Sequence, residues 1–267
     1  MIIPIYQVDA FTDQIFSGNP AAVCPLDFWP SDELLQNIAA ENNLSETAFI
    51  RKKDHFFEIR WFTPKSEVEL CGHATLAAAH VLFNHLHFRG DHLIFNSVYS
   101  GKLEVIRAED LLTLDFPVDR IEPALPPEYL FEALGNRPME IWKGKTDLLL
   151  YYQSQEDIEE ITPDYTLLQK IGTRGVIVTA PGYDCDFVSR FFAPNFGINE
   201  DPVTGSAHTT LVPFWAHRLN KLKFEARQLS ARGGFLECAL RGDRVLISGR
   251  AVTYLSGSIH ITTAEPV

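Results

Sequence analysis

Two stretches of this sequence have apolar or small residues all round the helix that each would form, and a glycine precedes each of them. Gly72 precedes the stretch 73–87, and Gly205 precedes the stretch 206–219. A helix that lacks a polar face is enclosed by other structure instead of lying on a surface. The sequence therefore predicts a central, buried helix in each half of the chain.

Segments that alternate between apolar and polar residues, or that are rich in β-branched and aromatic residues, surround both predicted helices. A turn cluster at 16–20 makes the first strand part of a hairpin, and a second hairpin is expected at 241–243. Shorter helices are expected from the N-cap Ser31 to about Asn43 and around 165–171. Strands are predicted at 3–11, 44–50, 56–63, 93–98, 102–107, 111–116, 147–152, 175–180, 186–192 and within 223–262.

The order of strand, proline, loop, glycine and buried helix occurs twice. A strand ends at Pro64 in the first half and at Pro194 in the second, and Cys71 and Asp201 follow seven residues after these prolines. An internal repeat predicts two similar domains, each a sheet wrapped around one helix. Prolines between 117 and 127 interrupt any regular element and mark the linker. The helix starts would then meet in a cleft, where ligands usually bind.

The chain of 267 residues and 30.1 kDa is acidic, with a net charge of −12 and a pI near 5.2. This charge argues against nucleic acid and anionic membranes as partners, because both need an electropositive face. We expect a small molecule or another protein as the partner. No apolar run reaches the roughly 18 residues of a membrane span, and the N-terminus has no basic region. A cytoplasmic protein is therefore expected.

The sequence contains no recognisable motif for a metal or a cofactor. Its four cysteines include no C-x-x-C pair and are expected to be reduced thiols. His80, His85 and His87 lack the H-E-x-x-H spacing, and they are expected to be packed or solvated. Neither a Gly-x-Gly-x-x-Gly sequence nor a Walker loop occurs. We predict no metal and no cofactor.

Glu46 is the first candidate for chemistry, since it lies in an apolar, β-prone segment. A partly desolvated carboxylate there would suit general acid/base catalysis, whereas the alternative is an edge-strand residue in water. Asp201 would be a second acid/base or simply a turn residue before proline. His73 at a helix start would bind a ligand or cap the helix. Ser206 would donate to a carboxylate or act as an N-cap.

Motifs at 16–23, 44–49, 71–75 and 200–208 together resemble the phenazine biosynthesis (PhzF-like) isomerase family. They read Phe-Ser-Gly-Asn-Pro-Ala-Ala-Val, Leu-Ser-Glu-Thr-Ala-Phe, Cys-Gly-His-Ala-Thr and Glu-Asp-Pro-Val-Thr-Gly-Ser-Ala-His. The resemblance implies an α+β, diaminopimelate-epimerase-like fold of two similar domains, each a mainly antiparallel sheet rolled around a central helix. The predicted domains are 1–118 and 119–257, with the C-terminal strand near 259–262, within 258–267, returning to complete the first.

The resemblance also implies a function. The family's best-known reaction is the isomerisation of trans-2,3-dihydro-3-hydroxyanthranilate by a homodimer, without metal or organic cofactor. By motif position, Glu46 is similar to the acid/base that carries the proton in this reaction. His73 and Asp201 complete the predicted catalytic set. The predicted substrate-binding residues are Gly72, Ala74, Gly205, Ser206 and Ala207. We therefore expect a cofactor-independent isomerase of a small amino or hydroxy carboxylic acid.

Two alternatives stay open at this point. One is a PhzF-like binding or interaction protein without turnover. The other is an epimerase or racemase that uses Cys71 as a thiolate at the helix start, where its pKa would be lowered. Related epimerases have a cysteine in each half, whereas this chain offers Cys71 and Asp201. The sequence therefore favours proton-shift isomerisation and a packing role for Cys71.

Overall fold

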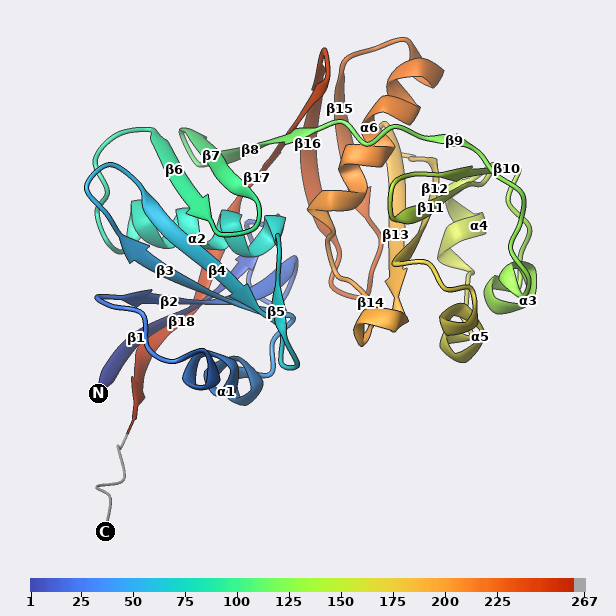
Figure 1. Cartoon of the computed structure of the whole chain (residues 1–267). Coiled ribbons are helices and arrows are strands. Elements are labelled where there is room, and N and C mark those ends of the chain that lie inside the picture. Colours follow the sequence, from blue (N-terminus) through green and yellow to red (C-terminus); the bar gives the residue numbers. More distant parts are fainter. Residues whose placement is uncertain (262–267) are drawn as a thin grey trace. The chain divides into compact units, whose positions relative to one another are not determined.

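The computed structural model describes residues 1–261 and divides the chain into two units. The first unit consists of Met1–Leu114 together with the C-terminal segment that begins at Gly249, and the second is Asp115–Ser248. In Figure 1 each unit has its own strands and its own long helix, α2 or α6. The observed boundaries fall slightly before the predicted ones at 118 and 257.

The first unit contains a mixed, mainly antiparallel sheet. Its neighbours run in the order β18, β1, β2, β3, β4, β6, β7, β8, and only the pairs β2–β3 and β4–β6 are parallel. The short β5 pairs with β4. The strands are β1 (Ile2–Ala10), β2 (Asn19–Leu26), β3 (Glu46–Lys52), β4 (Phe57–Phe62), β5 (Glu67–Val68), β6 (His92–Ser97), β7 (Gly101–Ala108), β8 (Leu111–Pro117) and β18 (Ala251–His260).

The C-terminal strand β18 lies beside the N-terminal strand β1. The two pair antiparallel from Ile2 opposite His260 to Ala10 opposite Ala251, with a bulge between Gln7 and Val8. This strand begins well before the predicted position near 259, and residues 262–267 of the predicted completing segment lie outside the described part of the chain. The pairing places both ends of the described chain in the first unit.

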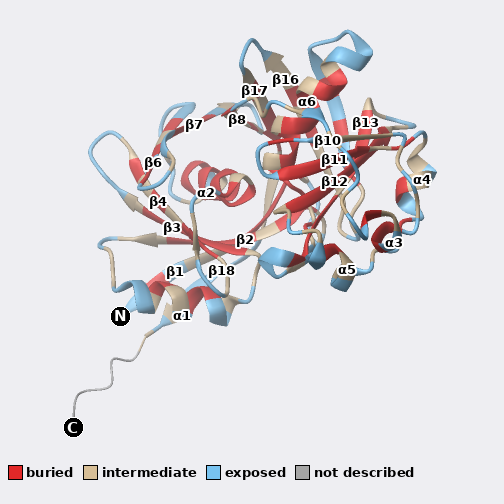
Figure 2. Ribbon diagram, turned by 45° about the vertical axis from the view of Figure 1, so that its right-hand side comes forward, coloured by how far each residue is buried: buried red, intermediate tan, exposed pale blue. Residues whose placement is uncertain are grey.

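Helix α2 (Gly72–Asn84) lies inside the roll of this sheet. It contacts β1, β2, β3 and β18, and its residues from His73 to Phe83 are buried except His80. Figure 2 shows α2 as a mostly buried helix with strands of the unit around it. The predicted central helix of the first half is confirmed, although it ends three residues before the predicted His87.

Helix α1 (Asp32–Asn42) covers the other face of the sheet. Ser31 accepts a hydrogen bond from the Leu34 N–H, and Asn43 ends the helix in the left-handed conformation. The buried side of α1 then packs on residues of β2, β3 and β4, because its apolar positions fall on one face. This core contains Ile3, Cys24, Leu35, Ile38, Ala39, Phe49 and Phe62.

The second unit repeats the strand arrangement of the first. Its order is β9, β10, β11, β12, β13, β15, β16, β17, with parallel pairs at β11–β12 and β13–β15 and the short β14 on β13. The strands are β9 (Glu122–Pro123), β10 (Glu140–Lys143), β11 (Asp147–Tyr151), β12 (Gly175–Pro181), β13 (Phe187–Ala193), β14 (Ile198–Glu200), β15 (Lys223–Gln228), β16 (Gly234–Arg241) and β17 (Arg244–Gly249). The proline-rich segment predicted as a linker therefore contributes a strand, β9.

Helix α6 (Gly205–Leu219) takes the place of α2 in the second unit, as predicted. It continues through Pro213, which has no N–H to offer the Thr209 carbonyl one turn earlier. That carbonyl accepts a hydrogen bond from the Asp119 N–H at 3.2 Å instead. The Asp119 carboxylate also accepts from the Thr210 hydroxyl at 3.0 Å. The proline is tolerated because a neighbouring segment satisfies the freed carbonyl.

Three short helices cover the opposite face of the second sheet. They are α3 (Leu130–Leu134), α4 (Gln155–Glu159) and α5 (Tyr165–Lys170), and a single 3-10 turn (Pro194–Phe196) follows β13. Their apolar residues join a core with β11, β12 and β13 that includes Leu150, Val178 and Phe192. Each unit thus has a central helix on one face of its sheet, with α1 on the other face in the first unit and three short helices there in the second.

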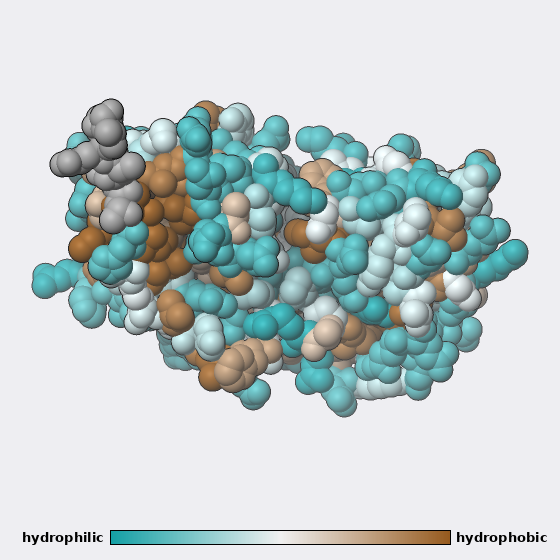
Figure 3. Space-filling model, turned by 90° about the horizontal axis from the view of Figure 1, so that it is seen from below, coloured by the Kyte–Doolittle hydropathy of each residue, from teal (hydrophilic) through white to brown (hydrophobic). Residues whose placement is uncertain are grey.

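Hydrophilic residues cover most of the face shown in Figure 3. On the face in Figure 3, apolar side chains gather beside the end of the described chain. None of the helices in the described part of the chain is both long and apolar enough to cross a membrane.

Candidate active site

The start of α2 brings together residues from two of the predicted motifs. The chain leaves α1 through the left-handed Asn43, and β3 begins at Glu46. Because β3 runs parallel to β2, with Glu46 opposite Ala21, both strands start at the same edge of the sheet. The first turn of α2 lies at this edge too, so that Glu46 meets His73.

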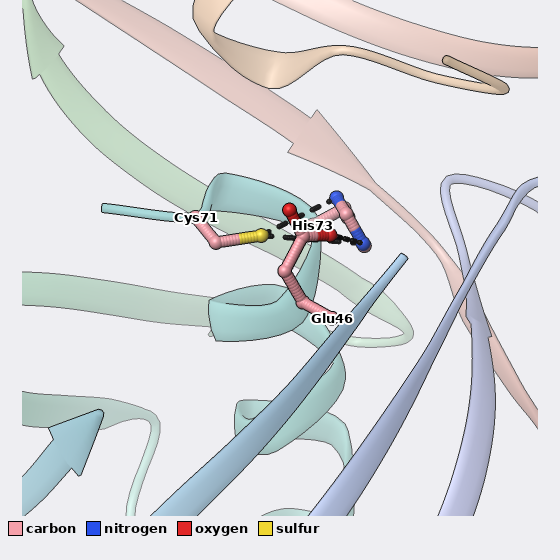
Figure 4. A group of neighbouring side chains, drawn as sticks. All are labelled: Glu46, Cys71 and His73. Atoms are coloured by element: carbon pink, nitrogen blue, oxygen red, sulfur yellow. Dashed lines mark hydrogen bonds and ion pairs between the residues drawn. The ribbon is translucent and has the colours of Figure 1, made fainter. Parts of the chain in front are cut away.

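Glu46 and His73 form a nearly buried pair. Glu46 Oε2 lies 3.2 Å from His73 Nε2, and the two residues are 9 % and 5 % exposed. Figure 4 shows the carboxylate and the imidazole turned toward each other, one from the start of β3 and the other from α2. Such a pair can hold a proton on either partner at low cost in charge separation.

Cys71 completes this cluster from the N-cap position of α2. Its sulfur lies 3.5 Å from His73 Nδ1 and 4.0 Å from His73 Nε2. Burial, with the charge of Glu46 adding to it, raises the pKa of the Cys71 thiol to about 11, although His73 and the Ala74 N–H oppose the shift. Cys71 is therefore a protonated thiol at neutral pH and not a ready nucleophile or base.

The imidazole of His73 favours its protonated form. Burial lowers the pKa of His73, but the charges of Cys71 and Glu46 and their hydrogen bonds outweigh it, and the net shift is well upward. Because Cys71 keeps its own proton at neutral pH, Glu46 supplies the negative charge that stabilises the imidazolium there. This charge outweighs the unfavourable dipole at the start of α2.

Asn19 is the residue at this site that the sequence did not single out. Its Nδ2 lies 3.2 Å from His73 Nδ1, and the residue is fully buried. Rotation of the amide by half a turn would offer oxygen in place of nitrogen, so Asn19 can serve a neutral or a protonated imidazole. The signal was present in the 16–23 motif, where Asn19 follows a glycine.

Gly18 explains how Asn19 reaches the site. It has φ +65°, and a Cβ there would lie 2.2 Å from the Ala10 carbonyl oxygen. The turn therefore requires glycine both for its backbone conformation and for the close approach to the end of β1. Asn19 then begins β2 at the edge where Glu46 begins β3.

In the second unit, Asp201 lies in a network just before α6. Its Oδ2 accepts a hydrogen bond from the Thr204 hydroxyl at 2.5 Å, and its backbone carbonyl accepts one from Gln228 Nε2 at 2.7 Å. Gln228 Oε1 in turn accepts from the Thr204 N–H at 2.8 Å. Asp201 is 8 % exposed. The network fixes the loop from Asp201 to Thr204 against β15.

Ser206 lies in the first turn of α6 beside an ion pair whose carboxylate is buried. Arg174 donates two hydrogen bonds to the Asp147 carboxylate, one of them 2.8 Å long, and a further one of 3.2 Å to Ser206 Oγ. The Asp147 side chain is 2 % exposed and that of Arg174 32 %. Arg174 and Asp147 were not identified from the sequence, because no motif contains them.

The predicted substrate-binding residues form the first turns of the two central helices. Gly72 and Ala74 lie in α2, and Gly205, Ser206 and Ala207 lie in α6. In the described chain, neither N-cap residue supplies the usual side-chain hydrogen bond to its helix, which suits both starts to binding an anion. The structure thus brings Glu46 and His73 into contact in one unit, whereas Asp201 and Ser206, both near the start of α6 in the other unit, contact different partners. That the two helix starts face one another stays a prediction.

The spacing argument that paired Cys71 with Asp201 needs a correction. Cys71 is the N-cap of α2, whereas the N-cap of α6 is Thr204, three residues after Asp201. The loop after Pro194 is longer because it contains the 3-10 turn and β14. Thr204 therefore takes the position of Cys71, and a second thiol is lacking there as well.

The duplicated fold and the buried carboxylate–imidazole pair define a two-domain α+β protein of the epimerase-like class. Residues 8–257 match the sequence model of the PhzC-PhzF family, described as phenazine biosynthesis-like protein, and the chain belongs to this family.

Relatives and solved structures agree with this assignment. A Pseudomonas aeruginosa protein named as an uncharacterized isomerase is 52 % identical, over 98 % of this chain and all of its own length. The crystal structure of an Enterococcus faecalis protein of the PhzF family has a TM-score of 0.95 and 46 % identity, covering 98 % of this chain and 100 % of that one. The Agrobacterium vitis hydroxyproline epimerase, at 10 % identity and TM-score 0.63 over 97 % and 92 % of the chains, shares the fold alone. The chain is an isomerase of this family.

Proposed function

We propose that the protein is a cofactor-independent isomerase that moves a proton between two carbons of a small amino or hydroxy carboxylic acid. Glu46 acts as the acid/base. The observation that carries this proposal is the nearly buried contact of 3.2 Å between Glu46 and His73 at the start of α2. Proton transfer of this kind needs a positioned base, an enclosed site and donors for developing charge.

In the proposed reaction, the Glu46 carboxylate removes a proton from a carbon of the unsaturated acid that lies next to its double bond. The double bond shifts, and Glu46 returns the proton to a second carbon, so that the residue ends in its starting state. His73 holds the carboxylate in place through its contact of 3.2 Å. Asn19 keeps the imidazole in a fixed orientation.

The first turns of the central helices bind the polar groups of the substrate in this proposal. Backbone N–H groups of Gly72 and Ala74 and of Gly205, Ser206 and Ala207 are the donors, and Asp201 is the acceptor that orients an amino or hydroxyl group. Anionic ligands are favoured at the positive ends of helices. This assignment requires both helix starts to face one substrate.

The test follows solvent deuterium into the substrate by NMR. The protein is incubated in D2O with trans-2,3-dihydro-3-hydroxyanthranilate and with a panel of unsaturated amino and hydroxy acids. The wild type should introduce deuterium at one carbon, and Glu46→Gln should slow this by about 100- to 10,000-fold. An exchange rate unchanged by Glu46→Gln would remove Glu46 from the mechanism.

The matched control is Glu41→Gln, which removes a carboxylate from the exposed surface of α1 in the same unit. It should leave exchange unchanged. Dialysis against a chelator should also leave the rate unchanged, since no metal takes part in the proposed steps. Exchange that is lost on chelation and regained with a metal would contradict cofactor independence.

A thiol-dependent epimerase receives less support from the structure. Cys71 would have to lose a proton from a thiol whose pKa is about 11, and Thr204 occupies the corresponding N-cap of the other unit. Cys71→Ser should therefore keep most of the exchange activity. On the family resemblance, we further propose that the protein is cytoplasmic and forms a homodimer. Light scattering would test the dimer.

A further inference from the structure

The proposed isomerase reaction leaves the sulfur of Cys71 without a role. Yet this sulfur, a carboxylate oxygen of Glu46 and a ring nitrogen of His73 all lie within 4.8 Å of one another. In Figure 4 the three side chains converge from the start of β3, the residue before α2, and α2 itself. Convergence of three ligand types on one point suits a metal ion.

The donor set is typical of zinc. Cysteine, histidine and glutamate are its usual ligands, and sites with three protein ligands keep a fourth position open. In a tetrahedral site with zinc–ligand distances of about 2.0–2.3 Å, ligand atoms lie roughly 3.3–3.8 Å apart. Here Glu46 Oε2 lies 3.2 Å and the Cys71 sulfur 4.0 Å from His73 Nε2. Small side-chain rotations would complete the geometry.

The surroundings of the cluster support metal binding in two further ways. Asn19 contacts His73 Nδ1 at 3.2 Å, which holds the ring and leaves Nε2 for a metal, as outer partners of metal-binding histidines do. Cys71 is the N-cap of α2, where the helix dipole stabilises a thiolate. Two anionic ligands would balance the charge of a divalent ion, so the buried site would be neutral overall.

We propose that Glu46, Cys71 and His73 form a site for a thiophilic divalent cation such as Zn²⁺, and that the bound ion inhibits the enzyme. On binding, the Cys71 thiol and His73 Nε2 release their protons to solvent, and nothing is oxidised or reduced. The ion binds the Glu46 carboxylate, which then cannot accept the substrate proton. The binding step stands on the geometry alone, whereas the inhibition rests on the proposed function.

Co²⁺ is the probe for the binding step, since its spectrum reports the ligands. Chelator-treated protein is titrated with Co²⁺, and a near-ultraviolet thiolate-to-cobalt charge-transfer band with tetrahedral visible bands is expected at one ion per chain, displaced by Zn²⁺. Cys71→Ser should abolish the charge-transfer band. Glu46→Gln and Asn19→Leu should weaken binding by about 10- to 100-fold. The control Cys185→Ser, a half-buried thiol of the other unit, should keep the band.

Wild-type protein without this band would overturn the proposal, as would a band that survives Cys71→Ser and vanishes in Cys185→Ser. Inhibition is then measured in the deuterium exchange assay, where Zn²⁺ should slow the wild type and affect Cys71→Ala at least tenfold less. Zn²⁺ that accelerates exchange would overturn the inhibition. If no acid undergoes exchange, the proposed function fails while the Co²⁺ titration still decides whether the site exists.

Discussion

The two units have the same strand order and the same parallel pairs, but they place different chemistry at the starts of their central helices. At the start of α2, the carboxylate of Glu46 faces the imidazole of His73. At the start of α6, the carboxylate of Asp147 is held by the guanidinium of Arg174, beside Ser206. An imidazole exchanges protons near neutral pH, whereas a guanidinium does not.

The two units of this duplicated fold differ in the side chain that partners a carboxylate at the start of a strand. Both carboxylates lie at the first residue of a strand in a parallel pair, Glu46 in β3 and Asp147 in β11. Only the first has a partner that can take up or release a proton. The first unit is therefore suited to acid/base chemistry, and the second to binding and support.

The largest expected effect concerns the ion pair of the second unit. Arg174→Ala would leave the Asp147 carboxylate, 2 % exposed, without its cation. Loss of one partner from a buried ion pair costs about 3–5 kcal/mol of the free energy of unfolding. Urea denaturation measures it. The control Arg250→Ala removes a surface pair with Asp110, whose side chains are 39 % and 66 % exposed, and should cost less than about 1 kcal/mol. Equal losses in both variants would show that the Asp147 pair is not special.

The turn that positions Asn19 gives a comparable effect in the first unit. Gly18→Ala combines a left-handed backbone with a Cβ 2.2 Å from the Ala10 oxygen, and we expect a loss of about 3 kcal/mol or more. Gly101→Ala is the matched control, with φ +66° and open space around its Cβ. It should cost only about 1 kcal/mol. Thermal and urea unfolding of both variants would be compared. Because both share the left-handed backbone, the difference between their losses of stability gives the cost of the clash at Gly18.

His73 of α2 and His208 of α6 should respond to pH in opposite directions. Burial lowers the pKa of His208 to about 4 from 6.5, with a partial offset from the Thr204 carbonyl. Between pH 6.5 and 4 the unfolded chain therefore binds the extra proton, and the folded state loses about 3 kcal/mol as pH falls. The pKa of His73 is raised above 6.5, so its stabilisation is present below that pH and is lost as pH rises through the folded-state pKa.

Urea unfolding of the wild type, His73→Gln and His208→Gln across this pH range checks both signs. Nitrogen NMR of the imidazoles should show His73 protonated and His208 neutral at pH 6.5. A neutral His73 in that spectrum would contradict the assignment of Glu46 as its ionised partner.

The smallest effect is expected at Asn19. Asn19→Leu removes the contact with His73 Nδ1 but keeps a side chain of similar volume. The deuterium exchange rate should fall by about tenfold through misorientation of the imidazole, equivalent to about 1.4 kcal/mol in the barrier. Asn19→Asp, which keeps an acceptor for Nδ1, should recover part of this loss. If both the rate of deuterium exchange and its dependence on pH were unchanged in both variants, Asn19 would have only a packing role.

Much of the first unit's site could be predicted from local sequence. Glu46 lies where a helix ends and a β-prone segment begins, and His73 lies one residue after the glycine that opens an apolar helix. Asn19 was within a recognised motif but was not assigned, because a turn motif does not show what its side chains face. The sequence therefore identified the residues and not their contacts.

The second unit was harder to predict in detail. Asp201 and Ser206 belong to a motif, whereas Arg174 and Asp147 stand in segments without one. The spacing from Pro194 matched Asp201 to Cys71, although Thr204 is the N-cap, because the 3-10 turn and β14 lengthen the loop. Counting along the chain cannot detect such an insertion.

The two enclosed helices, the duplicated order of elements and the segments that contain Glu46 and His73 could all be predicted from local patterns, because burial and turn formation follow from such patterns. Which of these residues contact one another depends on the folded chain. The pairing of β1 with β18, Asn19 with His73, and Arg174 with Asp147 and Ser206 depends on strand register and on how each sheet rolls around its helix. Register is set by the whole sheet, since a shift of one residue would turn each side chain to the opposite face.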